Sequence, residues 1–109
     1  MNNTRIQLLL QFIEEQPDDP FNVYALAMEY RDEQPAQALQ YLEKLLDQHP
    51  TYLPTYYKAA ELLTERNNRT EAETVYLRGI ELAREQKNEK AFQELNRAYR
   101  SFQDEEDDY

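Results

Sequence analysis

The sequence predicts an all-α fold of about six helices, and three observations support this. Only one of the 109 residues is glycine, and helix-forming Gln, Glu, Leu, Ala and Arg are abundant. Apolar residues recur at the three- and four-residue spacing of one helix face. The same pattern also returns 33 or 34 residues later in the chain. A fixed period of this length indicates antiparallel helix pairs stacked as a solenoid.

The clearest helical patterns lie back to back within residues 56–83. Small residues fall where two helices have to approach closely, at Ala60, Ala72 and Gly79. The polar break at residues 66–70 ends on Thr70, which we expect to cap the second helix of this pair. The apolar positions of the two patterns are Tyr56, Ala59, Ala60 and Leu63, then Ala72, Val75, Tyr76, Gly79, Ile80 and Ala83.

An upstream copy of the pattern establishes the repeat. Val23, Leu26, Ala27 and Tyr30 precede Tyr56, Ala59, Ala60 and Leu63 by 33 residues, and Ala38, Leu42, Leu45 and Pro50 precede Ala72, Tyr76, Gly79 and Arg84 by 34. This order of large, Leu, small and aromatic positions, followed by Ala, aromatic, Ala and Pro, resembles the tetratricopeptide repeat. In the second copy, Ala59, Leu63 and Arg84 depart from the family's Leu, aromatic and Pro. The resemblance covers residues 17–84 strictly and nearly the whole chain loosely, and it implies a helix-turn-helix solenoid.

Prolines and polar caps set the expected helix boundaries. Thr4 is a possible cap of the first helix, Asp19 is a favourable N-cap before Pro20, and Pro35 opens the third helix. Each repeat consists of two helices, which we call the first-type and the second-type helix in chain order. In this frame, the first helix of the chain is a second-type helix without its first-type partner, and the last helix is a first-type helix that caps the other end. The expected helices cover residues 4–16, 21–32, 35–48, 54–66, 70–86 and 88–103. We expect residues 1–103 to form one domain and residues 104–109 to form a disordered acidic tail.

Charge and composition exclude several classes of partner. The net charge is −10, and five of the acidic residues lie in the tail. Nucleic acids and anionic membrane surfaces are poor partners because binding to them depends on cationic side chains. No apolar run approaches the ~20 residues of a membrane span, and the N-terminus lacks a signal-peptide pattern. With no cysteine, no disulfide framework is expected, and we infer a cytoplasmic protein.

Catalytic, metal and cofactor sites are not expected. Ser101 and His49 are the only serine and histidine, they lie far apart, and cysteine is absent. One histidine without cysteine does not support a zinc site, and one glycine excludes a glycine-rich phosphate loop. The many carboxylate pairs fit solvated helix faces better than acid–base catalysis. We therefore expect no enzymatic activity and no cofactor.

The resemblance implies a concave groove lined by the second, fifth, ninth and twelfth residues of each repeat. Aromatic, Met and Arg side chains, which are enriched at protein interfaces, occupy several of these positions. Tyr24 and Met28 stand where chaperone-binding members of the family carry Lys and Asn, so that specific function is not expected. Alternatively, Tyr24 and Tyr57 are ordinary exposed aromatics. The predicted groove positions are Phe21, Tyr24, Met28 and Arg31, then Pro54, Tyr57, Glu61 and Thr64, then Lys90, Gln93, Arg97 and Arg100.

A local excess of basic residues suggests the nature of the ligand. Residues 84–100 hold five of the twelve basic residues, and Arg97 and Arg100 share a helix face on which they can hold one carboxylate. We expect an acidic or carboxylate-bearing protein or peptide, and the acidic tail at residues 104–109 is a candidate mimic of it. The alternative is that these cations pair with nearby glutamates on a solvated helix.

Three functional interpretations remain open from the sequence. The first is a non-catalytic protein- or peptide-binding module that uses the concave groove. The second is a structural protein that self-associates, because Leu8, Leu10 and Phe12 widen the apolar surface of the first helix beyond one stripe; a monomer and a weak homodimer are both open. The third is an enzyme or its regulatory subunit.

Overall fold

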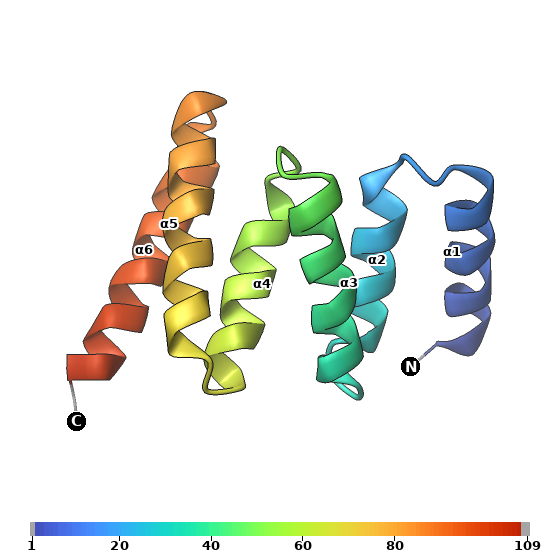
Figure 1. Cartoon of the computed structure of the whole chain (residues 1–109), viewed down its shortest axis with the longest axis horizontal. Coiled ribbons are helices and arrows are strands. Elements are labelled where there is room, and N and C mark those ends of the chain that lie inside the picture. The colour runs from blue at the N-terminus through green and yellow to red at the C-terminus, as the bar shows by residue number, and fades with distance from the viewer. Residues whose placement is uncertain (1, 108–109) are drawn as a thin grey trace. The chain divides into compact units, whose positions relative to one another are not determined.

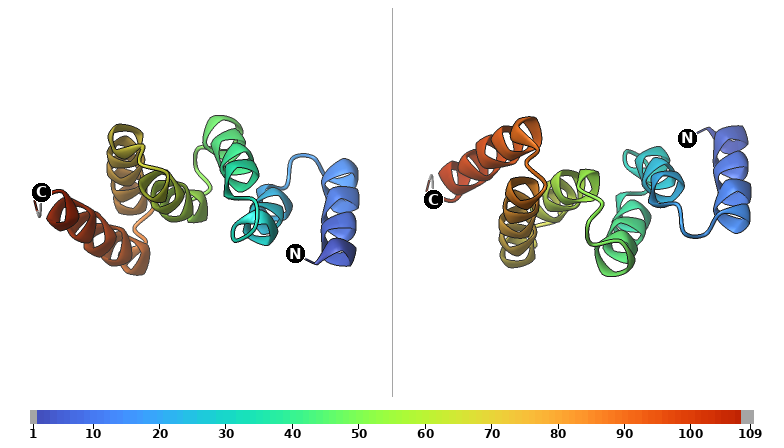
Figure 2. Two further views of the ribbon diagram at one scale, coloured as in Figure 1. Left: turned by 90° about the horizontal axis from the view of Figure 1, so that it is seen from below. Right: turned by 90° about the horizontal axis from the view of Figure 1, so that it is seen from above.

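The computed structural model describes residues 2–107, which form six α-helices and no strand (Figure 1). The predicted all-α helical-repeat fold is therefore confirmed, and every predicted helix is present with its boundaries shifted by no more than a few residues. Consecutive helices run in opposite directions within each part of the chain (Figure 1), and Figure 2 shows the same helices from below and from above. The helices are α1 (Asn3–Glu15), α2 (Pro20–Tyr30), α3 (Pro35–Gln48), α4 (Pro54–Glu65), α5 (Arg69–Glu85) and α6 (Glu89–Asp107).

Contacts divide the chain into two compact units, Met1–Thr55 and Tyr56–Tyr109. Unit 1 contains α1, α2 and α3, whereas unit 2 contains most of α4 together with α5 and α6. The organisation of residues 1–103 as a single domain stays a prediction.

The core of unit 1 forms where α2 packs against both α1 and α3. The inward stripe of α1, Ile6 and Leu9, is buried against Ala25 and Leu26 of α2. The core is extended by Ile13, Tyr30 and Tyr41, of which the two tyrosine rings stack with centroids 5.9 Å apart.

The core of unit 2 depends on the close approach of helices at Gly79, as the sequence predicts. A Cβ atom placed on Gly79 of α5 would lie 2.7 Å from Tyr56 Cβ on α4 and 3.4 Å from Leu95 Cδ1 on α6. The missing side chain therefore lets α5 meet both neighbouring helices. Beside this contact, the rings of Tyr76, Tyr99 and Phe102 cluster, with centroids 5.4 to 6.1 Å apart.

Two of the expected helix caps are replaced by asparagines. The Asn2 side chain, rather than that of Thr4, caps α1 by accepting a hydrogen bond from the Arg5 backbone N–H at 3.0 Å. Asn68, rather than Thr70, caps α5, because its Oδ1 accepts from the Glu71 N–H while its Nδ2 donates to the Glu71 carboxylate at 2.9 Å. This reciprocal pair satisfies more groups than a hydroxyl at position 70 can, so α5 begins earlier than expected.

The caps of the next two helices follow the sequence. Asp19 accepts a hydrogen bond from the Phe21 N–H at 3.0 Å, and Pro20 takes the first position of α2. Pro35 likewise opens α3, although Gln34 provides no side-chain cap.

The last helix is longer than expected, because α6 continues past residue 103 to Asp107. Arg69, at the start of α5, holds this segment: its Nη2 donates to the Phe102 carbonyl at 2.6 Å, and its guanidinium lies 4.0 Å from the centre of the Phe102 ring. Glu105, one turn further on, approaches the same guanidinium at 4.0 Å. Residues 104–107 are thus helical in the structure, where the sequence predicts a disordered tail, and Asp108 and Tyr109 lie outside the described residues.

Candidate peptide-binding surface

In unit 1, the predicted groove residues follow one face of α2. They are spaced by three, four and three residues, which places them in a row along the helix. Phe21 opens the row with 58% of its surface exposed, and Tyr24, Met28 and Arg31 are half-buried. The α2 helix therefore presents an aromatic and thioether surface that ends in a cation.

Tyr24 is held in place by a residue that the sequence did not single out. The ring of Tyr52, in the turn before α4, meets the Tyr24 ring edge-on at a centroid distance of 5.9 Å. Burial raises the pKa of Tyr52, and the Asp19 carboxylate adds to this shift. Tyr24 is thus half-buried and one of an aromatic pair, and its role in binding stays a prediction.

In unit 2, α4 carries a second set of predicted groove residues with the same spacing. Tyr57, Glu61 and Thr64 are half-buried there, and the Thr64 hydroxyl donates to the Ala60 carbonyl at 2.8 Å. Lys58 joins them, because its Nζ lies 3.9 Å from the Glu61 carboxylate and 5.5 Å from the centre of the Tyr57 ring. This part of the surface carries both signs of charge.

Tyr76 of α5 extends this surface, although its repeat position suggests only a core role. The pKa of Tyr76 is raised to about 12, mainly by burial; Tyr57, Glu61 and Glu105 also raise it, whereas a hydrogen bond with Thr64 lowers it. The ring therefore packs in the core while the hydroxyl reaches the polar row of α4. The signal in the sequence is the tyrosine itself, since a buried phenol oxygen needs a polar partner and a phenylalanine does not.

On α6, the predicted basic residues Lys90, Arg97 and Arg100 are exposed, and so is Gln93. None of the three cations forms an ion pair with another residue that the structure describes. Arg84, by contrast, pairs with Glu81 on α5, and the pKa of its guanidinium is raised by that hydrogen bond and charge. The alternative of pairing with nearby glutamates thus holds for Arg84 but not for Arg97 and Arg100.

The predicted set falls partly in each unit. Phe21, Tyr24, Met28 and Arg31 lie together in unit 1, and the α4 and α6 positions lie in unit 2; a single groove lined by both sets stays a prediction. Residues 104–107 are part of α6, so they are not an extended ligand in this structure. Within the described part of the chain, no group of three or more His, Asp or Glu side chains is placed to hold a metal ion. None of the described helices is both long and apolar enough to span a membrane.

Comparison with known proteins gives the family. A profile of the tetratricopeptide repeat matches residues 29–95, which is more than half of the chain. The chain belongs to the tetratricopeptide repeat family. The predicted resemblance to this family is thereby confirmed, and TPR domains generally mediate protein–protein interactions. No curated protein matches this TPR chain.

Solved structures agree with this assignment. The crystal structure of a tetratricopeptide repeat domain protein from Salinibacter ruber is 35% identical, with a TM-score of 0.74, and the match covers 78% of this chain and 96% of that one. A solution structure of a Salinibacter ruber tetratricopeptide repeat domain protein gives the same identity and TM-score, covering 80% and 89%. A protein from Bordetella parapertussis, at 23% identity and a TM-score of 0.76, shares the fold over 92% of this chain and 88% of its own.

Proposed function

We propose that this TPR chain is a non-catalytic module that binds a protein or peptide segment on the exposed faces of α2, α4 and α6. The main support is the interface-type side chains on the first-type helices, led by the exposed Phe21 and the half-buried Tyr24. The absence of cysteine and the single histidine leave little for catalysis. We propose a cytoplasmic location as part of the same hypothesis.

The ligand we propose is acidic, or ends in a carboxylate. Arg97 and Arg100 lie three residues apart on one helix face and are exposed. Guanidinium groups bind carboxylates through two parallel hydrogen bonds, and two such groups on one face can hold a single acidic terminus. In unit 1, Phe21 and Tyr24 offer a place for an apolar or aromatic side chain of a ligand.

A defined peptide tests this proposal. The last six residues of the chain, Asp104–Tyr109, combine acidic side chains with a terminal aromatic, so a synthetic peptide of this sequence with a fluorescent label is a suitable probe. We expect it to bind the wild-type protein in fluorescence polarisation, and to bind less well when its terminal carboxylate is amidated. Binding should be lost in the double variant Arg97→Glu with Arg100→Glu.

The matched control reverses two exposed cations away from this surface, Lys44→Glu with Arg66→Glu, and therefore changes the net charge equally. It should bind the peptide nearly as the wild type does. If both double variants lose peptide binding equally, only net charge matters. If the Arg97 and Arg100 variant binds the peptide as well as the wild type does, the assigned site is wrong. Circular dichroism confirms that each variant is folded.

The apolar part of the surface is tested separately with Phe21→Ala. Because 58% of Phe21 is exposed, this substitution should leave the fold intact. We expect it to weaken binding of an acidic peptide that carries an aromatic residue more than binding of one that carries alanine there. If Phe21→Ala weakens binding of both peptides equally, Phe21 is not part of the binding site.

A further inference from the structure

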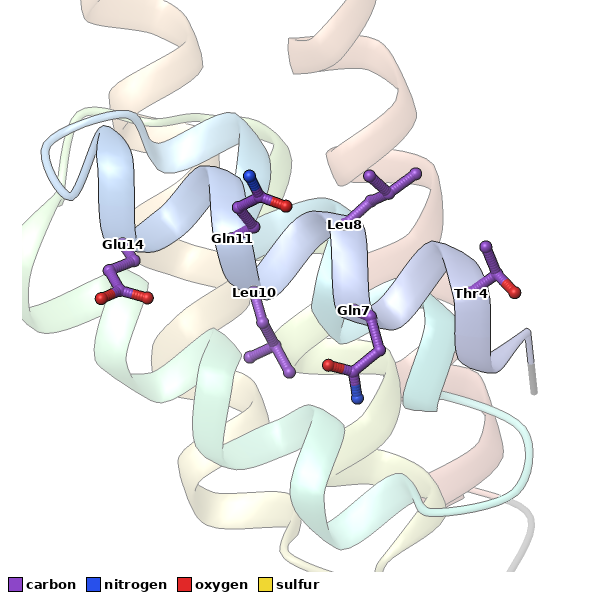
Figure 3. Close-up of a pocket in the computed structure, with 6 residues that line it drawn as sticks. All are labelled: Thr4, Gln7, Leu8, Leu10, Gln11 and Glu14. Carbon is purple, nitrogen blue, oxygen red and sulfur yellow. The ribbon is translucent and has the colours of Figure 1, made fainter.

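The outer face of α1 is uncovered in unit 1. One stripe of α1 faces the core at Ile6 and Leu9, whereas Leu8, Leu10 and Phe12 remain 48%, 38% and 44% exposed. Between Leu8 and Leu10 lies an open pocket of about 540 Å³ formed by α1 side chains alone (Figure 3). Its lining residues are Thr4, Gln7, Leu8, Leu10, Gln11 and Glu14.

This set of side chains is symmetric about Leu9. Gln7 and Gln11 are identical and lie two residues on either side of it, and the identical Leu8 and Leu10 are its direct neighbours. Thr4 and Glu14 lie five residues on either side, and both are polar. A surface with this order reads nearly the same in both directions along the helix.

We propose that α1 binds α1 of a second copy of this chain, antiparallel, about a two-fold axis beside Leu9. A two-fold interface brings the same patch of both subunits together, so residue pairs equally far from the axis on opposite sides meet each other. The pairing sets Gln7 opposite Gln11 of the second copy, where each amide offers both a donor and an acceptor.

The remaining positions fit the same axis. The Thr4 hydroxyl lies opposite Glu14 of the second copy and can donate a hydrogen bond to its carboxylate. Leu8 lies opposite Leu10 of the second copy, one residue to either side of the axis, and the exposed surface of both leucines becomes buried. These contacts occur twice because of the symmetry.

The charge of this face allows a second copy to bind there, although the net charge of the chain opposes pairing elsewhere. Each molecule carries a net charge of −10, so two copies repel each other over most of their surfaces. Only Glu14 is charged among the six lining residues, and the opposing Thr4 is neutral. The face of α1 is therefore a place where two copies meet with little like-charge contact.

The size of the face predicts a weak association. The 13 residues of α1 span about 20 Å, and one face of such a helix buries less than the roughly 1,200 Å² of a stable interface. The dimer therefore forms at high protein concentration and dissociates on dilution.

Cysteine cross-linking tests both the pairing and its direction. The chain has no cysteine of its own, so introduced thiols are unique. An equimolar mixture of Thr4→Cys and Glu14→Cys proteins should form a disulfide-linked dimer under mild oxidation. Each variant alone should not, because its two thiols would lie about 15 Å apart along the helix, beyond the reach of a disulfide. Dimers of each variant alone, or no dimer in the mixture, would overturn the antiparallel pairing.

Sedimentation equilibrium over a concentration series measures the association itself. Leu8→Lys places two cations beside the axis and removes two buried leucines, and it should weaken self-association by more than about tenfold. The control Leu77→Lys changes an equally exposed leucine, at 47%, on α5, and should associate like the wild type. A constant monomer mass for the wild type at the highest concentration, or equal effects of the two variants, would overturn the proposal. This experiment does not depend on peptide binding, so its failure leaves the proposed function of the other surface untouched.

Discussion

At Gly79, one missing side chain controls the packing of unit 2. Replacing a mid-helix glycine by alanine usually stabilises a helix by about 0.5–1 kcal/mol. Here the new Cβ would lie 2.7 Å from Tyr56 Cβ, which is fixed to the α4 backbone and cannot rotate away. Overpacking of this kind costs about 1–3 kcal/mol, so we expect Gly79→Ala to lower the free energy of unfolding by up to about 2 kcal/mol in urea denaturation.

Thr74→Ala, also on α5 but exposed, serves as its control and should be neutral or slightly stabilising. If the Gly79→Ala protein is as stable as this control, α4 moves away from the new Cβ atom without lowering the free energy of unfolding.

The Tyr76 hydroxyl gives unit 2 a dependence on alkaline pH. The pKa of Tyr76 rises from 10.0 to about 12 in the folded chain, so the folded state keeps a proton that the unfolded state has released. The stabilisation is fully present below about pH 10 and is lost as the pH rises through about 12. Urea denaturation between these pH values should therefore show a smaller loss of stability for Tyr76→Phe than for the wild type.

Tyr41→Phe retains Tyr76 and every group that shifts its pKa, so the stability of this variant should fall with pH as steeply as that of the wild type. If the free energy of unfolding of Tyr76→Phe falls with pH as steeply as that of the wild type and of the control variant, the shift in the pKa of Tyr76 does not contribute to stability.

Single residues also show why the candidate site is only partly predictable from sequence. Tyr24 and Arg97 could be placed because the repeat frame fixes which helix positions stay outside the core. Tyr52 and Tyr76 were missed because their roles arise from contacts between different helices or with turns. Lys58 was missed although its partners Tyr57 and Glu61 lie on the same helix. A periodic pattern gives the face of a helix but does not give the neighbours of that face.

Among the helices, α2 depends most clearly on its first turn. The Asp19 side chain accepts a hydrogen bond from the Phe21 N–H at 3.0 Å, which satisfies one of the unpaired donors at the helix start. We expect Asp19→Ala to lower the free energy of unfolding by about 1 kcal/mol, measured by urea denaturation.

Asp18→Ala removes the same charge from the adjacent exposed position, which is not the N-cap, and should have little effect. Similar losses for the two variants would assign the effect to charge and not to capping.

The boundaries of the elements were largely predictable, because prolines at positions 20, 35 and 54 start three of the helices. The errors lie at the ends that side chains control. Asn2 and Asn68 cap their helices in place of the expected threonines. Arg69 holds the end of α6 through its hydrogen bond to Phe102, which lies 33 positions further along the chain. Local sequence rules do not contain contacts of that range.

For the molecule as a whole, the net charge of −10 opposes the proposed pairing of two copies. Salt shortens the range of this repulsion from about 30 Å at 0.01 M to about 8 Å at 0.15 M. We therefore expect the sedimentation mass of the wild type at a fixed concentration to increase with salt over this range. Leu8→Lys should remain largely monomeric throughout, and a wild-type mass that decreases with salt would contradict a neutral interface.

The pairing of α1 with α2, of α2 with α3 and of α5 with α6 joins helices that are neighbours along the chain. Such connectivity gives a low contact order, because few distant segments have to find each other before native contacts form. Helical proteins with this property fold in about microseconds to milliseconds. In unit 1, each helix can dock on the one before it as soon as it exists, so the apolar stripes of α2 and α3 are exposed to other chains only briefly.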